Sequence, residues 1–392
     1  MKITDIKTYC LAYSYKNYIA DGYSCCKGRS ALLVLVETDC RDMTGIGECA
    51  TFGAPTTAVA EIIEKQLKPL LVGEDPSGIE YLYEKMTLTS WANGRRGLVL
   101  GAISGIDIAL WDLLGKAAGM PVYKLLGANR DRVRTYASAG FYAPNKSLDD
   151  LKREFEGYRE QGYTAYKMKI GRTDSVTKSP HRYLEKGNVL LSRDEDLRRV
   201  EAVREVIGPD TCLMLDMNCT WTVQDVLASR SFFEENRIYW IEEPILNTDL
   251  GGYKELCKGL PSTMVAASES AQGLDTYLSM LQKGCVDVVQ AGLGWTGGFT
   301  GVRRIAALTL AYNKIFSPHT FFSAVMTAAN AHLAASLPNV PFIESEVNEN
   351  PFRTELLETP LETDAEMNFV LSDRPGLGIS LNMDTIEKYS II

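Results

Sequence analysis

From about residue 134 onward, short apolar runs alternate with longer segments in which apolar residues recur every three or four positions. The short runs predict β-strands and the longer segments predict amphipathic helices. The predicted strands are Arg134–Ala139, Ala165–Ile170, Cys212–Asp216, Tyr239–Glu242, Met264–Ala267, Val286–Gln290, Ile315–Ser317 and Phe342–Glu344. The predicted helices between them are Leu148–Gln161, Asp194–Ile207, Thr222–Glu234, Gly252–Lys258, Leu274–Lys283, Thr300–Asn313 and Ala324–Ser336. Strands that alternate with helices in this way predict a parallel (β/α) barrel.

The first third of the chain has a different pattern. Its predicted strands are Met1–Tyr13, Ala31–Glu37 and Gly45–Cys49, and its predicted helices are Thr56–Leu71, Ile79–Leu88 and Leu98–Ala118. This order predicts an α+β domain ahead of the barrel. The segment after the last barrel strand is irregular and rich in Pro, Asn and Asp, and we predict that it returns to the first domain. The predicted division is 1–125, 126–355 and 356–392.

One connection is longer and more polar than the others. Arg172–Arg193 directly follows the strand Ala165–Ile170, at the end of the barrel where active sites form. A lid over the substrate, a surface excursion and a subunit contact are all compatible with such a segment.

Composition limits the classes of function. The chain has 392 residues, of which 45% are hydrophobic and 23% are charged, as is typical of a soluble globular protein. A net charge of -9 argues against non-specific binding of nucleic acid. The apolar stretch Val99–Leu114 is interrupted by Asp107 and Asp112, so we expect no membrane span and interpret these two acids as structural. Nine cysteines without a C-x-x-C pair, and no signal peptide, predict reduced thiols in a cytoplasmic protein.

Lys167 and Lys169 lie two positions apart in the predicted strand Ala165–Ile170. Successive side chains of a strand point to opposite faces, so both ammonium groups project to the same side. Inside a barrel this pair needs anionic partners, and each ammonium group would lower the pKa of the other, as burial also would. A lysine with a lowered pKa can act as a base. An edge strand with both lysines on its solvated face is the alternative that this motif alone leaves open.

Acidic residues follow one another at the ends of neighbouring predicted strands. They are Asp216, Glu242 with Glu243, Glu269, Asp287 and Glu344. Carboxylates that converge on a barrel mouth repel each other, and a hard divalent cation such as Mg²⁺ relieves the repulsion. Strand alternation allows one of the two adjacent glutamates to face inward, and we assign Glu242 to that position, with Glu243 behind it as a candidate partner of Lys167.

His319 follows Ser317-Pro318 at a predicted strand end, next in order to the strand that bears Asp287. A carboxylate beside an imidazole fixes its tautomer and makes it a competent acid or base. The other two histidines, His181 and His332, are interpreted as structural. The glycine-rich run Gly292–Gly298 contains no P-loop lysine, so it predicts a tight turn beside the site.

These residues, as an ordered set, resemble the enolase superfamily, specifically its mandelate racemase subgroup. The resemblance covers nearly the whole chain and rests on Lys167-Met168-Lys169, Leu215–Asn218, Trp240–Pro244, Glu269, Asp287 with Gln290, Ser317–His319, Ile343-Glu344 and Ser104–Asp112. It implies an α/β fold: a modified (β/α)7-8 TIM barrel with an N-terminal α+β capping domain completed by the C-terminal segment. Ser268 and Gln290 depart from the family's common residues.

The resemblance also implies roles for individual residues. Asp216, Glu242 and Glu269 would ligate Mg²⁺, and Lys169 would be one base, with Lys167 assisting at the substrate carboxylate. His319 would be the acid or base on the opposite face, oriented by Asp287, and Glu344 would contact the carboxylate or enediolate oxygen. Cap loops at Tyr18–Cys26 and Thr51–Pro55 would close over the substrate. Members of the family are often homo-oligomers, so we expect one here.

The implied reaction is Mg²⁺-dependent abstraction of the proton α to a carboxylate through a metal-stabilised enediolate. Polar residues in the cap loops favour a sugar acid as the small-molecule substrate and its dehydration to a 2-keto-3-deoxy acid as the outcome. Racemisation or epimerisation, and lactone cycloisomerisation, are the alternatives. A non-catalytic sugar-acid binding protein is the alternative of another class.

Overall fold

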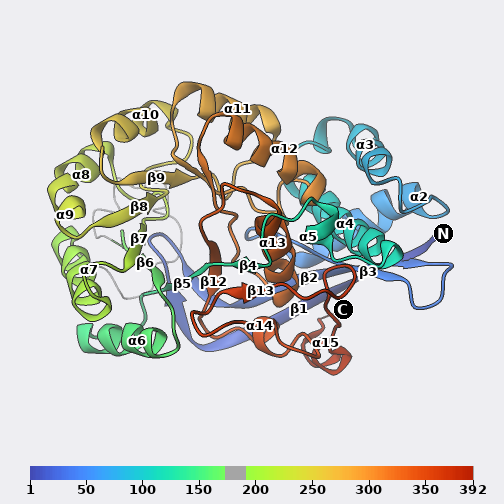
Figure 1. Cartoon of the computed structure of the whole chain (residues 1–392), viewed down its shortest axis with the longest axis horizontal. Coiled ribbons are helices and arrows are strands. Elements are labelled where there is room, and N and C mark those ends of the chain that lie inside the picture. Colours follow the sequence, from blue (N-terminus) through green and yellow to red (C-terminus); the bar gives the residue numbers. More distant parts are fainter. Residues whose placement is uncertain (173–190, 392) are drawn as a thin grey trace.

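The structure is a computed structural model that describes residues 1–172 and 191–391. Its centre is an eight-stranded sheet of order β11-β10-β9-β8-β7-β6-β5-β12, in which every neighbouring pair is parallel (Figure 1). The strands are β5 (Thr135–Ala139), β6 (Ala165–Lys169), β7 (Cys212–Asp216), β8 (Ile238–Glu242), β9 (Met264–Ala267), β10 (Val288–Val289), β11 (Ile315–Phe316) and β12 (Ile343–Glu346). At the other end of the sheet order, Phe316 N–H of β11 donates to the carbonyl of Asn339, in the segment that leads into β12, at 3.0 Å. The predicted barrel is confirmed.

Helices cover the outside of this sheet. They are α6 (Leu148–Glu160), α7 (Arg193–Ile207), α8 (Val223–Ala228), α9 (Arg230–Glu235), α10 (Leu250–Gly259), α11 (Leu274–Lys283), α12 (Gly298–Ala311) and α13 (Ala324–Ser336). The first helix after β12 is the short α14 (Pro351–Thr354), so the barrel is modified at its last unit, as predicted. The helix predicted over Thr222–Glu234 is instead two helices, because Ser229 leaves the helical conformation with φ -94° and ψ 5°.

Three helices that follow barrel strands begin with a capping box at a Ser or Thr N-cap. Ser147, Ser192 and Thr222 each accept a hydrogen bond from the backbone N–H three residues later, and the acidic side chain there pairs back with the cap. Such capping boxes satisfy N–H groups that the first helical turn leaves free. They set where α6, α7 and α8 begin, and therefore the lengths of the loops at the barrel mouth.

The first domain packs an antiparallel sheet against helices. Its elements are β1 (Ile3–Ala20), β2 (Cys25–Thr38), β3 (Thr44–Cys49), α1 (Thr56–Ile62), the π-helix η1 (Ile63–Leu67), α2 (Lys68–Leu71), α3 (Ile79–Thr89), the 3₁₀-helix η2 (Trp91–Asn93), α4 (Gly97–Ala118) and α5 (Val122–Leu125). A Cβ on Gly47 would lie 2.0 Å from the carbonyl oxygen of Gly105, so only glycine lets β3 approach α4 this closely. Helix α4 is long and apolar enough to cross a membrane, but 78% of its most apolar window is buried inside the protein.

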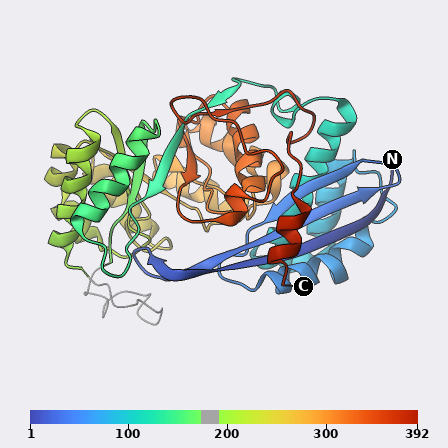
Figure 2. The ribbon, with the colours of Figure 1, turned by 90° about the horizontal axis from the view of Figure 1, so that it is seen from below.

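The C-terminal segment returns to the first domain. Its β13 (Phe369–Val370) pairs with β4 (Arg132–Val133), and its α15 (Met383–Tyr389) contacts β1. Ile391 N–H donates to the carbonyl of Cys10 at 2.9 Å. Figure 2 shows this segment lying across the long strands β1 and β2, which run from the cap toward the barrel. The cap is therefore completed by the C-terminal segment, as predicted.

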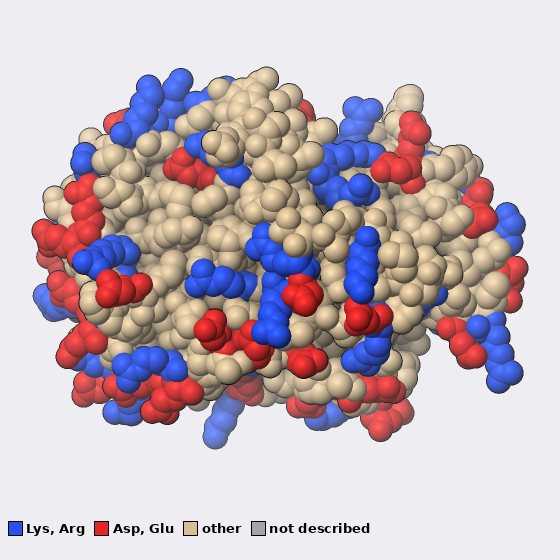
Figure 3. Space-filling view, in the orientation of Figure 1, with Lys and Arg blue, Asp and Glu red and all other residues tan. Residues whose placement is uncertain are grey.

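Charged side chains of both signs are interspersed on the face shown in Figure 3. Asp112 is structural, as predicted: its carboxylate is buried, pairs with Lys116 at 2.6 Å and accepts from the N–H of Ile46 at 2.9 Å. All nine cysteines are free thiols. The predicted insertion Arg172–Arg193 and His181 lie largely or wholly outside the described residues.

Buried carboxylates of the cap hold the N-termini of two barrel helices. Glu48 at the end of β3 accepts from the Ser323 hydroxyl at 2.6 Å, from the Ser323 N–H at 3.1 Å and from the Met326 N–H at 3.0 Å, at the start of α13. Asp107 on α4 accepts from the Thr300 N–H at 3.0 Å, near the start of α12. Burial raises the pKa of both groups to about 7. The cap therefore docks through groups whose charge depends on pH.

This docking predicts a pH-dependent stability. A carboxyl with a raised pKa in the folded state favours folding when protonated, so its contribution is present below the unfolded value of 4.5 and is lost as pH rises through about 7. For Glu48 the loss is on the order of 3 kcal/mol. We expect the Tm of the native protein to fall from about pH 5 to about pH 8, and to fall less in Glu48→Gln. Equal falls in the two proteins, measured by thermal denaturation, would contradict this account.

Candidate active site

Lys167 and Lys169 both point into the barrel from β6. This strand is paired on both sides, with β5 and β7, so it is not an edge strand. The Lys167 ammonium lies 2.6 Å from a Glu242 oxygen and 3.1 Å from a Glu344 oxygen. Lys169 donates a short hydrogen bond to Asp216, the last residue of β7. The two lysines are therefore buried at 1% and 7% exposure because carboxylates from neighbouring strands surround them.

The expected lowering of the lysine pKa values is wrong for this arrangement. Burial is the largest single effect and lowers the pKa of Lys169, and Lys167 lowers it further, but the carboxylates of Asp216, Glu269 and Asp21 together outweigh them and the pKa is raised. Burial likewise opposes the charge on Lys167, yet Glu242 and Glu344 raise its pKa well above the ordinary value. Both side chains are ammonium ions in this structure. Lys169 must therefore lose its contact with Asp216 before it can accept a proton.

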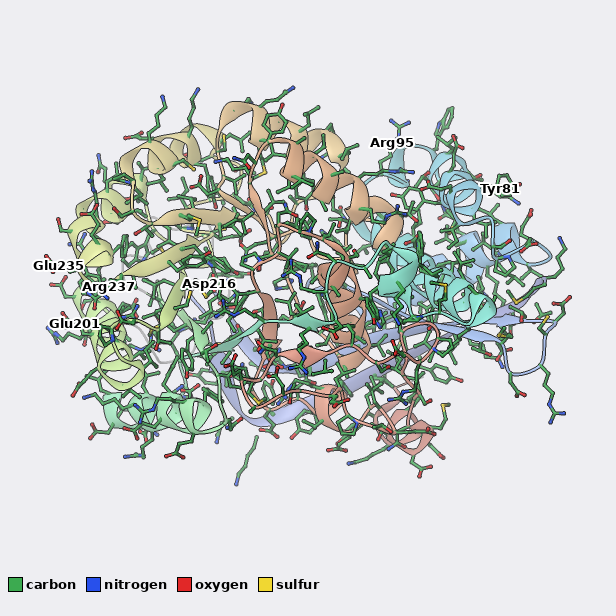
Figure 4. All side chains as sticks on the ribbon, viewed as in Figure 1. Tyr81, Arg95, Glu201, Asp216, Glu235 and Arg237 are labelled. Carbon is green, nitrogen blue, oxygen red and sulfur yellow. The ribbon has the colours of Figure 1, made fainter. Side chains whose placement is uncertain are left out.

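The structure brings the predicted acids together at the ends of β7, β8 and β9. Glu242 faces the barrel interior, where it also accepts from the Gln290 amide at 2.7 Å. Glu243 is buried too, because its φ of 38° breaks the strand alternation. The predicted pairing of Glu243 with Lys167 is wrong. Glu243 accepts instead from the thiol of Cys219 at 3.2 Å. Figure 4 shows Asp216 on β7, whereas the labelled Glu201, Glu235 and Arg237 lie at the outer rim.

The chemistry of this set of donors fits a hard divalent cation. Burial raises the pKa of Glu243 well above its ordinary value, and the nearby carboxylates of Glu269 and Asp216 raise it further. One oxygen of Glu243 has no hydrogen-bond partner. A cation beside these groups would relieve their repulsion. Among the described residues no three acidic, histidine or cysteine side chains surround one point, because Lys167 lies between Asp216 and Glu242.

Asp287 is not the partner of His319. It precedes β10, at the opposite end of the strand from the barrel mouth, and its carboxylate pairs with Lys314 at 2.7 Å and accepts from the Val265 N–H at 3.1 Å. The Nδ1 atom of His319 is buried without a partner. A Cβ added to Gly292 would lie 4.0 Å from this atom. The position from which a carboxylate could reach the imidazole is thus occupied by a glycine.

His319 is held instead by carboxylates at Nε2 and by aromatic rings. Its Nε2 lies 3.3 Å from a Glu269 oxygen and 3.9 Å from a Glu344 oxygen. Its ring centroid lies 5.7 Å from that of Phe52 and 5.6 Å from that of Phe322. Since Phe52 belongs to a predicted cap loop, cap and barrel both determine the orientation of the imidazole. The contact with Phe52, which lies far from His319 in the chain, left no signal in the sequence.

A cavity of about 270 Å³ is lined by four of the eight predicted catalytic and metal-binding residues. Lys169, Glu269, His319 and Glu344 line its barrel side, and Asp21, Tyr23, Cys26, Thr51, Phe52 and Gly53 line its cap side. Both predicted cap loops thus reach the cavity. Arg29 on β2 and Phe321 also line it, and our sequence analysis missed them, because nothing in the pattern of a cap strand shows that its side chain meets the barrel.

Comparisons with known proteins agree with this architecture. A family model described as Mandelate racemase / muconate lactonizing enzyme, N-terminal domain, matches residues 24–127, and one described as Enolase C-terminal domain-like matches residues 150–385. Arabinonate dehydratase from Saccharolobus solfataricus is 34% identical over 391 residues, which is 99% of both chains. D-galactarolactone cycloisomerase from Agrobacterium fabrum is 33% identical over 402 residues, again 99% of both chains.

The structural comparison extends to a protein with bound metal. The crystal structure of L-talarate/galactarate dehydratase from Salmonella typhimurium LT2, liganded with Mg and L-lyxarohydroxamate, matches with a TM-score of 0.86 and 26% identity. The match covers 100% of this chain and 93% of that chain. The chain therefore belongs to the enolase superfamily, in the group of mandelate racemase and muconate lactonizing enzyme.

Proposed function

We propose that this protein is a Mg²⁺-dependent acid-sugar dehydratase. The observation that carries the proposal is the placement of Lys169 and His319 in one cavity, on opposite sides of the barrel. Two strands, β5 and β12, separate β6 from β11 on one side, and four strands separate them on the other. A substrate between the two groups would meet a base on one face and an acid on the other.

The chain's own residues can divide the reaction between them. Lys169 Nζ, once it has left Asp216 and released a proton to solvent, takes the α-proton as the C–H bond breaks. Lys167 stays an ammonium ion at the floor of the site, next to Glu344, and stabilises negative charge that develops on the substrate carboxylate. His319 donates a proton from Nε2 to the β-hydroxyl, which leaves as water. The enol product then becomes the 2-keto-3-deoxy acid.

Asp216, Glu242 and Glu269 are the residues that we propose to hold the cation. When bound, Mg²⁺ would supply positive charge to the substrate carboxylate. The magnesium in the related dehydratase structure supports this assignment.

The relatives support the reaction class, and they also favour a second candidate. Two of them are named as dehydratases, of arabinonate and of talarate or galactarate, whereas two are named as cycloisomerases. A cycloisomerase or an epimerase would use the same opposed groups without losing water. We place dehydration first because a dehydratase of arabinonate matches over 99% of both chains at 34% identity.

The test is a library of acid sugars, assayed with Mg²⁺ in D₂O. Dehydration predicts a keto acid that reacts with semicarbazide. Deuterium at the α-carbon of an unchanged skeleton would instead identify an epimerase, and a rearranged lactone would identify a cycloisomerase. If no acid were turned over while one of them bound, the protein would be a binding protein and the proposal would be wrong.

A further inference from the structure

Above the reacting groups, the cavity is bounded by a buried ion pair between cap and barrel. Arg29 of β2 and Glu346 of β12 lie 2.8 Å apart, with side chains only 5% and 3% exposed. Glu346 is two residues after Glu344 in the same strand, so both side chains face the barrel interior and Glu346 stands one layer nearer to the mouth. The ion pair therefore lies on the cap side of the substrate cavity, away from Lys167.

Further contacts of Glu346 and of Arg29 hold the ion pair together, so the charge of Arg29 stays neutralised. Glu346 also accepts from the Asn348 N–H at 2.8 Å and from the Asn350 amide at 3.2 Å, which fixes its carboxylate as an acceptor. The guanidinium of Arg29 stacks on Phe321, with its carbon 3.8 Å from the ring centroid. A planar guanidinium held on two sides in this way cannot turn to a new anion without breaking a buried pair.

Other charges beside the cap loop provide no net positive field. Asp21 lines the cavity and accepts from the Ser24 N–H and hydroxyl. Arg172, fully buried behind the loop, donates to the carbonyl oxygens of Asp21 and Ser24 and does not line the cavity. Among the described residues that line it, the lysines and arginines are Lys169, at the reacting end, and the neutralised Arg29.

We propose that the Arg29–Glu346 pair makes this site selective for acid sugars with one carboxylate and rejects those with a second carboxylate at the far end. A hydroxyl group at the far end of the substrate would meet uncharged or neutralised groups. The Nε–H of Arg29 is buried without a hydrogen-bond partner and could donate to the oxygen of that hydroxyl group. A distal carboxylate would lose its water beside Asp21, and near the Glu346 that neutralises Arg29, without gaining a further cation from the described residues that line the cavity. This inference rests on the proposed function, since it names the substrate class of the same site.

The experiment compares an aldonic acid with the aldaric acid of the same chain length and stereochemistry, which differ only in the terminal group. In the native protein we expect kcat/KM to favour the monoacid by on the order of 100-fold. Glu346→Gln leaves Arg29 unpaired and should shift this ratio toward the diacid by at least about 10-fold. The double variant Arg29→Gln, Glu346→Gln removes both charges and should keep the native preference.

A purely structural ion pair would change the Tm of the variants and leave the ratio of the two substrates unchanged, and that result would overturn the proposal. So would a native preference for the diacid. Binding of each acid in the presence of Mg²⁺, measured by calorimetry, separates this inference from the proposed function. Selective binding of monoacids without turnover would refute the dehydratase alone, whereas turnover that favours diacids would refute the selectivity alone.

Discussion

Lys169→Ala is expected to lower kcat by about 10²–10⁴-fold, the contribution typical of a positioned general base. Lys169 is the lysine that lines the cavity, whereas Lys167 lies beneath it among Glu242, Glu344 and Asp216. Removal of the Lys169 amine should abolish exchange of the substrate's α-proton with D₂O as well as product formation. A small primary amine added to the variant should restore part of the exchange, because the truncated side chain leaves space in the cavity.

Lys314→Ala is the matched control for this prediction. Lys314 also pairs with an aspartate, at 2.7 Å, but the pair lies at the opposite end of the barrel. The control should keep native kcat while losing some stability. Unchanged exchange of the α-proton in Lys169→Ala would show that another group is the base.

Removal of divalent cations is expected to abolish activity, and added Mg²⁺ should restore it. A readout without catalysis is the thermal stability. A ligand that binds only the folded protein stabilises it by about 2.7 kcal/mol at 100 times its Kd, so Mg²⁺ should raise the Tm of the native protein. Asp216→Asn and Glu269→Gln should lose most of this increase, because each removes a charged oxygen donor from the proposed site.

Asp287→Asn is the control for the metal site. Its carboxylate is bonded to Lys314 and to the Val265 N–H, so we expect lower stability, an unchanged response to Mg²⁺ and an unchanged pH profile of kcat. A Tm that rises equally with Mg²⁺ in the native protein and in Asp216→Asn would contradict the metal assignment. A loss of His319-dependent proton exchange in Asp287→Asn would restore the original expectation that Asp287 orients the imidazole.

No carboxylate of the described residues contacts His319 Nδ1, and this bears on the mechanism. An imidazole with a carboxylate on one nitrogen works readily as a base on the other, as a two-base racemase requires. Here the carboxylates of Glu269 and Glu344 lie 3.3 and 3.9 Å from Nε2, so Nε2 is the nitrogen placed to donate a hydrogen bond. This arrangement suits an acid for a leaving hydroxyl better than a second base, and it supports dehydration over epimerisation.

Two features of this chain were readable from the order of residues alone. The alternation of apolar runs with amphipathic segments predicted the parallel barrel, since period and strand length are local properties of the chain. Strand direction then placed the side chains of Lys167, Lys169, Asp216, Glu242 and Glu269 at one mouth, because the carboxyl ends of parallel strands meet at one edge. The family resemblance rested on the same ordered set.

Other features depended on which groups meet across the fold. Whether Lys169 is charged depends on its distance from Asp216, and the partner of Asp287 depends on where its strand begins. The buried pair of Arg29 with Glu346 joins residues 317 positions apart, and Phe52 reaches His319 from another domain. Electrostatic and packing energies depend on distances in space, and the spacing of residues along the chain does not determine those distances. The sequence by itself therefore determined the barrel and the candidate reacting groups, and only the tertiary structure decided their charge states, their partners and the shape of the cavity.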